Sequence, residues 1–203
     1  LPGTGIGFGY SAMNNIGLNR RKICYASFPQ GTNPIKDFIP VARITDLLEN
    51  PGGRFDYDGQ SYEYPDIKMV WWAGGNPFHH HQDLNRMCRA WEKPDTIIVN
   101  EWCWNSTAIH ADIVLPCTTP LERSDIALTP KDPYQVAMDQ VISPVGDARD
   151  DHEIFRGIAA LMGCEDAFTE GRSPQEWQRW IYDRSRQQAS RAGVELPTWD
   201  EFQ

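Results

Sequence analysis

Hydrophobic residues in the middle of the chain follow two different spacings in turn. A mostly apolar run at Ile67–Trp72 predicts a buried strand, and hydrophobic residues recur at helical spacing within Gln82–Glu92. Two further apolar runs predict strands at Thr96–Val99 and Asp112–Leu115, with a short turn or helix at Ser106–His110 between them. Strands that alternate with helices are typical of an α/β fold with a mostly parallel sheet. Because the strands show little polar alternation, we expect helices on both sheet faces, as in a three-layer Rossmann-like domain.

Elements outside this core are marked by turn and cap residues. A helical pattern begins at Val41 and should end near Pro51, because proline disfavours helical geometry at the preceding residue. The dipeptide Asp58-Gly59 suits the tight turn of a short hairpin. A helix is expected at His152–Met162, and a last helix opens at Ser173–Glu176 with serine and glutamate in capping-box positions.

The first 40 residues differ from the rest of the chain in composition. They are rich in Gly, Asn, Ser and Pro without a sustained period, which predicts an irregular loop segment at residues 1–40 and an α/β domain at residues 41–203. The net charge of −9 argues against a nucleic acid as the main partner, because binding a phosphate backbone requires a basic surface. No apolar run of the sequence is long enough to span a bilayer.

A glycine pair follows the first predicted strand and precedes the first predicted helix of the core. Gly74 and Gly75 permit positive φ and close approach of a bound group to the main chain. Asn76 suits contact with a phosphate, a ribose or a pterin edge, although it could equally be an ordinary turn residue. Asn100 holds the equivalent position after the next strand. Two polar strand ends in succession predict a nucleotide-binding crevice at the carboxyl edge of the sheet.

Three consecutive histidines, His79–His81, raise the possibility of a metal site. Neighbouring side chains diverge from one another, whereas metal ligands must converge, so the pattern favours one imidazole that binds a ligand or loop backbone. The five cysteines include no CxxC pair, which argues against a zinc cage or a complete disulfide framework. We expect buried or half-buried free thiols.

Two charged residues have both a structural and a functional interpretation. Arg123 could hold a phosphate with two hydrogen bonds, or it could pair with Glu122 or Asp125. Asp151 could cap the helix that follows, or its carboxylate could accept two N–H groups from a guanine edge. The sequence leaves both alternatives open.

Several motifs together resemble one enzyme family. The segments Trp72–Phe78, His80–Asp83, His110–Pro116 and Glu122–Ile126 are similar in residue type and spacing to the molybdopterin oxidoreductases of the dimethyl sulfoxide reductase family. Among its branches, the biotin sulfoxide, dimethyl sulfoxide and trimethylamine N-oxide reductases look nearest. The likeness continues more weakly to the end of the chain.

The resemblance implies a cofactor and a role for individual residues. Enzymes of this family bind molybdenum through two molybdopterin guanine dinucleotides and remove an oxygen atom from an S-oxide or N-oxide. The chain would bind one of the two dinucleotides. Asn76 and His80 would approach it from the turn, Asn100 and Arg123 would line the crevice, and Asp151 would contact the guanine. The implied cofactor-binding residues are Gly75, Asn76, His80, Asn100, Arg123 and Asp151.

The resemblance also implies that the chain is an internal piece of a catalytic subunit. Leu1–Gly3 look like an internal loop of the family, and the metal's protein ligand belongs to an earlier part. The remaining domains of the subunit are therefore expected partners, with an S-oxide or N-oxide substrate and an electron donor that the sequence does not identify. We expect the isolated chain to be inactive and to lack the molybdenum cofactor. Relatives include both cytoplasmic and periplasmic enzymes, so the compartment stays open.

Two other interpretations compete with this one. The first is a doubly wound nucleotide-binding module without molybdenum chemistry. The second is a structural fragment that binds no ligand on its own.

Overall fold

The computed structural model describes residues 26–35, 38–128 and 135–203. The chain divides into two compact units, which are considered separately. The sheet unit comprises Thr32–Thr118 and Val145–Ile154, and the helical unit comprises the remaining residues. Because much of the segment before residue 41 lies outside the described residues, the boundary between an irregular segment and an α/β domain stays a prediction.

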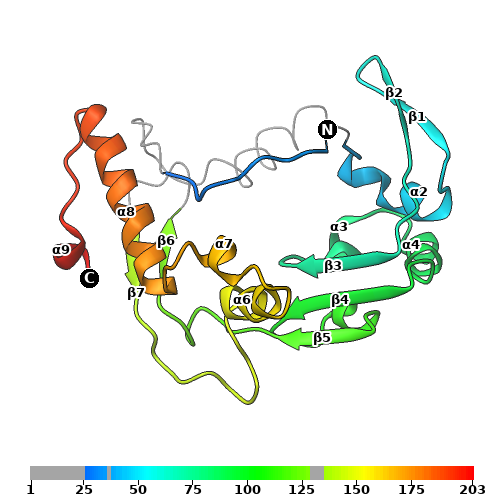
Figure 1. The fold of residues 1–203 in the computed structure, drawn as a ribbon. Helices are drawn as coiled ribbons and strands as arrows, with labels where there is room; N and C mark the ends of the chain where they lie inside the picture. Colours follow the sequence, from blue (N-terminus) through cyan, green and yellow to red (C-terminus); the bar gives the residue numbers. More distant parts are fainter. Residues whose placement is uncertain (1–25, 36–37, 129–134) are drawn as a thin grey trace, which may run out of the picture. The chain divides into compact units, whose positions relative to one another are not determined.

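Three parallel strands form the centre of the sheet unit. β3 (Met69–Ala73), β4 (Thr96–Glu101) and β5 (Ile113–Pro116) lie in the order β3-β4-β5. Figure 1 shows their arrows side by side and pointing the same way. The mixed α/β class with a parallel sheet is therefore confirmed. In this register Ala73 lies opposite Asn100, and Asn100 lies opposite Leu115, so the carboxyl ends of the strands meet at one edge.

A fourth chain segment extends this edge. Arg149 forms a parallel bridge with the residue after β5, donates its N–H to the carbonyl of Pro116 (3.1 Å) and accepts from the N–H of Thr118 (3.2 Å). The next two residues, Asp150 and Asp151, therefore follow the sheet at its carboxyl end, where α6 (Asp151–Leu161) begins.

Five short helical segments accompany the sheet in the described part of this unit, before α6 begins. The 3₁₀-helix η1 (Val41–Arg43) leads into α2 (Ile44–Glu49), which packs against α4 (Leu84–Trp91). The short helices α3 (Pro77–His80) and α5 (Ser106–Ile109) contact each other. The predicted helices are thus confirmed, and α3 is an addition, with proline at its first position.

Aromatic packing fixes α3 and α4 on the sheet. The ring of Trp91 lies 5.6 Å from that of Phe78 in an edge-to-face contact and 6.0 Å from that of Trp72. Burying each such side chain contributes roughly 1.5–3 kcal/mol, so this contact supports the turn between β3 and α3. The buried cluster comprises Leu48, Phe78, Met87, Ala90, Trp91, Ile97 and Val99.

The predicted hairpin is also present. β1 (Arg54–Tyr57) pairs with β2 (Gln60–Glu63) in antiparallel register. Asp58 and Gly59 have φ of 50° and 75°, as a turn with two left-handed central residues requires.

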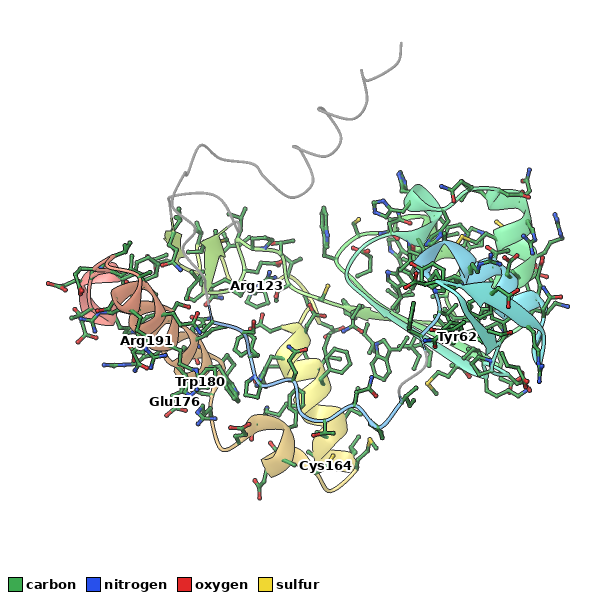
Figure 2. All side chains as sticks on the ribbon, turned by 90° about the horizontal axis from the view of Figure 1, so that it is seen from above. Tyr62, Arg123, Cys164, Glu176, Trp180 and Arg191 are labelled. Carbon is green, nitrogen blue, oxygen red and sulfur yellow. The ribbon has the colours of Figure 1, made fainter. Side chains whose placement is uncertain are left out.

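The helical unit contains helices and a second hairpin. β6 (Asp125–Leu128) pairs with β7 (Gln135–Met138), and α7 (Glu165–Thr169), α8 (Pro174–Arg191) and α9 (Trp199–Phe202) follow α6. The helices expected at α6 and α8 are confirmed, whereas the hairpin, α7 and α9 were not predicted. Glu176 and Trp180 lie near the start of α8 and Arg191 at its end (Figure 2). Within the described ranges, no helix has the length and apolar character needed to cross a membrane.

Candidate functional site

The turn after β3 presents main chain to open space. Gly74 and Gly75 have φ of 80° and 82°, and both residues are exposed. A Cβ at Gly74 would meet nothing within 4 Å, and one at Gly75 would meet only the indole nitrogen of Trp72, at 3.8 Å. Two successive glycines in this conformation leave room for a bound group to approach the peptide units.

The indole N–H of Trp72 adds a second observation at the same turn. This N–H is buried and has no hydrogen-bond acceptor among the described residues. Buried polar groups without a partner are uncommon, and the buried indole N–H of Trp91 in the core is another example, so this observation supports a binding site only together with the open turn. The glycine turn therefore combines open space with an unsatisfied donor beside it.

Asn76 is held at the end of the turn by a buried residue. Its Oδ1 accepts a hydrogen bond of 2.7 Å from the hydroxyl of Thr107, which is fully buried in α5. Its main-chain carbonyl accepts from the N–H of His79 (3.0 Å) at the start of α3. The amide nitrogen has no partner among the described residues, so this donor is not used within the described structure.

The three consecutive histidines differ in their exposure to solvent. His79 and His80 are exposed on α3, while His81 is half-buried at its end. Burial, assisted by the neighbouring His80, lowers the pKa of His81. The described residues contain no group of three or more His, Cys, Asp or Glu side chains able to hold a metal ion.

Asn100 connects two other side chains at the carboxyl edge of the sheet. The indole N–H of Trp71 donates to Oδ1 of Asn100 at 3.0 Å, and Nδ2 of Asn100 donates to Oδ1 of Asp151 at 2.8 Å. Asn100 itself is only 3% exposed, whereas Asp151 is exposed. The structure thus brings together the predicted residues Asn100 and Asp151, and it adds Trp71.

The neighbouring carboxylate is held in a similar way. The hydroxyl of Thr118 donates to Oδ1 of Asp150 at 2.6 Å, and the main-chain carbonyl of Asp150 accepts from the N–H of Ile154 (2.9 Å). Asp150 therefore makes the first main-chain bond of α6. Sequence reasoning could not identify Thr118, because its role depends on the bridge at Arg149.

A buried glutamate organises the loop after β4. Glu101 is 8% exposed and accepts hydrogen bonds from the amide of Asn105 and from the main-chain N–H of Trp102. Trp102 and Trp104 project outward, with 64% and 75% of their surfaces exposed. Glu101 could not be found from the sequence, since a glutamate at the end of a strand looks like a surface residue.

Arg123 belongs to the helical unit. Its Nε donates to Oδ2 of Asp125 at 3.2 Å, so the predicted ion pair with Asp125 is present. Glu122 accepts from the main-chain N–H of Thr119 (2.7 Å). Contact of Arg123 with a phosphate stays a prediction.

The cysteines are free thiols in the described part of the chain, but their burial differs from expectation. Cys117 is buried and Cys88 is half-buried, whereas Cys103 and Cys164 are exposed. The expectation was wrong for the last two because both lie in loops that follow a strand or a helix.

Comparison with known proteins gives a consistent result. The family model described as molybdopterin oxidoreductase matches residues 11–161. The chain is 45% identical over 99% of its length to a biotin sulfoxide reductase of Cereibacter sphaeroides, of which it covers 27%. It is 47% identical over 81% of its length to a dimethyl sulfoxide/trimethylamine N-oxide reductase of Rhodobacter capsulatus, of which it covers 20%. The chain thus spans about a quarter of the length of these relatives.

A solved structure supports the fold. The acetylene hydratase from Pelobacter acetylenicus superposes on 68% of this chain, and on 18% of its own, with a TM-score of 0.50 and 24% sequence identity. This likeness concerns the fold alone. Since the family model matches most of its residues, the chain belongs to the molybdopterin oxidoreductase family.

Proposed function

We propose that this chain is the part of a molybdenum-dependent S-oxide or N-oxide reductase that binds one molybdopterin guanine dinucleotide. The proposal rests mainly on the open glycine turn at the end of β3, in a chain that is 45% identical to a biotin sulfoxide reductase. A three-layer Rossmann-like arrangement, with the dinucleotide at the carboxyl edge of the parallel sheet, is part of this proposal.

The residues at this edge fit such a cofactor. Gly75 leaves room for a phosphate beside the main chain, and the amide nitrogen of Asn76 is available as a donor. His80 is exposed on α3, close in sequence to the turn. The carboxylate of Asp151 suits the adjacent N–H groups of a guanine. Asn100 lies at the same edge, whereas Arg123, in the helical unit, is included only because the family resemblance implies it.

The cofactor would supply a redox centre at which an oxygen atom is removed from the substrate, with two electrons needed for each turnover. The chain's own residues bind and orient the dinucleotide. We place the metal's protein ligand and most of the substrate pocket in other domains of the parent protein. The isolated chain is therefore expected to reduce no substrate.

The test of this function uses the full-length parent protein, purified after growth with molybdate. We expect molybdenum and guanine nucleotide in the purified protein, and reduction of dimethyl sulfoxide, trimethylamine N-oxide or biotin sulfoxide by a reduced viologen dye. A parent that contains neither molybdenum nor guanine nucleotide would refute the proposal. It would favour a nucleotide-binding module without molybdenum chemistry.

The guanine assignment has its own test. Titration calorimetry of the parent's apoprotein with GDP and ADP should show tighter binding of GDP, and Asp151→Asn should remove this preference. Asp183→Asn, a change of the same kind on α8, serves as the control, because Asp183 lies in the helical unit. Equal affinity for GDP and ADP in the unaltered protein would show that Asp151 does not read the base.

A further inference from the structure

The hydrogen bonds of Asn100 have only one possible direction. An indole nitrogen can donate but cannot accept, so the group that faces Trp71 must be the amide oxygen. An ionised carboxylate can accept but cannot donate, so the group that faces Asp151 must be the amide nitrogen. The two neighbours therefore fix the orientation of the amide, which is otherwise hard to assign.

The amide of Asn100 is buried, so both of its polar ends need hydrogen-bond partners within the protein. Asn100 is 3% exposed, so an unpaired amide group there would be costly. Both ends of the amide are satisfied, one by Trp71 and the other by Asp151. A buried, rigid group on a strand thus holds an exposed carboxylate on the first residue of a helix.

The hydrogen bond from Asn100 uses only part of the accepting capacity of the Asp151 carboxylate. Oδ1 of Asp151 accepts from Asn100, while Oδ2 has no partner among the described residues. Both oxygens keep lone pairs for further hydrogen bonds, because each oxygen can accept about two. Asp151 is therefore held in place without losing its capacity to accept from a ligand.

We propose that Asn100 is a positioning residue, oriented by Trp71, that holds the carboxylate of Asp151 for recognition of a guanine base. The inference rests on the proposed function, in which Asp151 reads the guanine. Guanine presents two neighbouring N–H donors, whereas the corresponding edge of adenine presents one donor and one acceptor. A fixed carboxylate matches the first pattern and opposes an acceptor in the second.

The proposal predicts an effect on base preference, which a purely structural role would not produce. Without the hydrogen bond from Asn100, the Asp151 side chain can sample other rotamers. The affinity for GDP should then fall, whereas the affinity for ADP should not. Loss of a hydrogen bond to a charged group corresponds to about a tenfold change in binding. A structural defect would instead lower stability and weaken both nucleotides alike.

The experiment measures GDP, IDP and ADP binding to the 203-residue chain by calorimetry, with thermal unfolding of each variant alongside. Asn100→Ala should weaken GDP binding about tenfold and leave ADP within about twofold. IDP lacks the 2-amino donor, so Asn100→Ala should weaken it less than GDP. Trp71→Phe keeps an aromatic ring but removes the donor to the amide, and it should give a smaller loss in the same direction. Trp91→Phe is the matched control, because its indole N–H has no acceptor in the described structure.

The outcomes separate the inference from the function on which it rests. If the unaltered chain prefers GDP and Asp151→Asn abolishes the preference, but Asn100→Ala and Trp71→Phe retain it, the positioning role is overturned. If Asn100→Ala weakens GDP and ADP equally, the residue is structural and the inference again fails. If the unaltered chain binds GDP and ADP equally, the guanine assignment itself fails.

If the 203-residue chain binds no nucleotide at millimolar concentration, the same variants are measured in the parent protein. There the readout is guanine nucleotide per polypeptide after purification. Asn100→Ala should lower it as Asp151→Asn does, while Trp91→Phe should not. Full retention in Asn100→Ala would contradict the inference.

Discussion

Gly75 shows how one backbone angle links the fold to the proposed site. Its φ of 82° is unfavourable for any residue with a Cβ, by roughly 1–2 kcal/mol. Gly75→Ala should therefore lower the free energy of unfolding by about 1 kcal/mol and also weaken cofactor retention, because the new methyl group would occupy the open space in front of the turn.

Gly52→Ala is the matched control for this change. Gly52 has φ of 76° and open space around its Cβ position, but it lies before β1. Urea unfolding should show a similar loss of stability in both variants, whereas the molybdenum content of the parent should fall only for Gly75→Ala. Equal cofactor content in the two variants would show that Gly75 does not contribute to cofactor binding.

Single residues also show why sequence reasoning reached only part of the candidate site. Gly75, Asn76 and Asp151 could be proposed from turn chemistry and helix position. Thr107 and Trp71 could not, since a threonine in a short helix and a tryptophan in a strand carry no sign of their partners. Their contacts join residues that are far apart in the sequence, and no local sequence pattern predicts such tertiary contacts.

At the scale of elements, the start of α8 depends on a capping box. Oγ of Ser173 accepts from the N–H of Glu176 (3.2 Å), and Oε2 of Glu176 accepts from the N–H of Ser173 (2.8 Å). The main-chain N–H and the hydroxyl of Ser173 lower the pKa of Glu176. Because the pKa is lower in the folded state, its stabilisation is present above the unfolded pKa and is lost as pH falls through the folded value.

Glu176→Gln keeps an acceptor in the box but removes the charge. The variant should be less stable than the unaltered chain at pH 7. The difference should begin to shrink near pH 4.3, about the pKa of a glutamate in an unfolded chain, and should vanish once the pH is below the lowered pKa of the folded state. Thermal unfolding across this pH range checks the expectation. A difference that does not shrink between pH 7 and pH 2 would contradict it.

An ion-pair group joins α2 to α4. The guanidinium of Arg86 donates from Nε to Glu49 (2.6 Å) and from a terminal nitrogen to Asp46 (2.5 Å). These hydrogen bonds, chiefly the one to Glu49, raise the pKa of Arg86, so the group stays charged at all ordinary pH values. A lysine cannot reproduce this two-sided geometry.

Arg86→Lys should therefore lower the melting temperature, and the loss should shrink at high salt because the pairs are partly exposed. Arg54→Lys is the control, since Arg54 is 78% exposed and its contact with Glu63 is 4.0 Å long. Equal melting temperatures for Arg86→Lys and Arg54→Lys would show that the group does not hold the helices together.

The elements that the sequence predicted are those with a strong period or a clear cap. β3, β4, β5, α4 and α8 belong to this class. The hairpin of β6 and β7 was missed because no tight-turn dipeptide such as Asp58-Gly59 stands between its strands in the sequence. α9 could have been found, since Thr198 and Glu201 form a second capping box.

At the scale of the whole molecule, large apolar side chains remain exposed in a chain that spans about a quarter of its relatives' length. Trp104, Val141, Leu161 and Met162 are each at least 71% exposed. We expect other domains of the parent to cover part of this surface.

The isolated chain should therefore bind the dye anilinonaphthalene sulfonate and associate in a concentration-dependent way, whereas the full-length parent should do neither to the same extent. Dye fluorescence and sedimentation of both proteins check this. Equal dye binding per unit mass would show that these side chains stay exposed in the parent.

The bridge at Arg149 has a consequence for synthesis. It joins the edge of β5 to a segment 32 residues further along, after the chain has passed through β6 and β7. A nascent chain that has emerged only as far as Thr118 can pair its three parallel strands, but it lacks both carboxylates that the sheet edge holds. The guanine-facing end of the proposed site therefore forms only after the three-stranded sheet, so a cofactor that requires it can be captured only after residue 151 has left the ribosome.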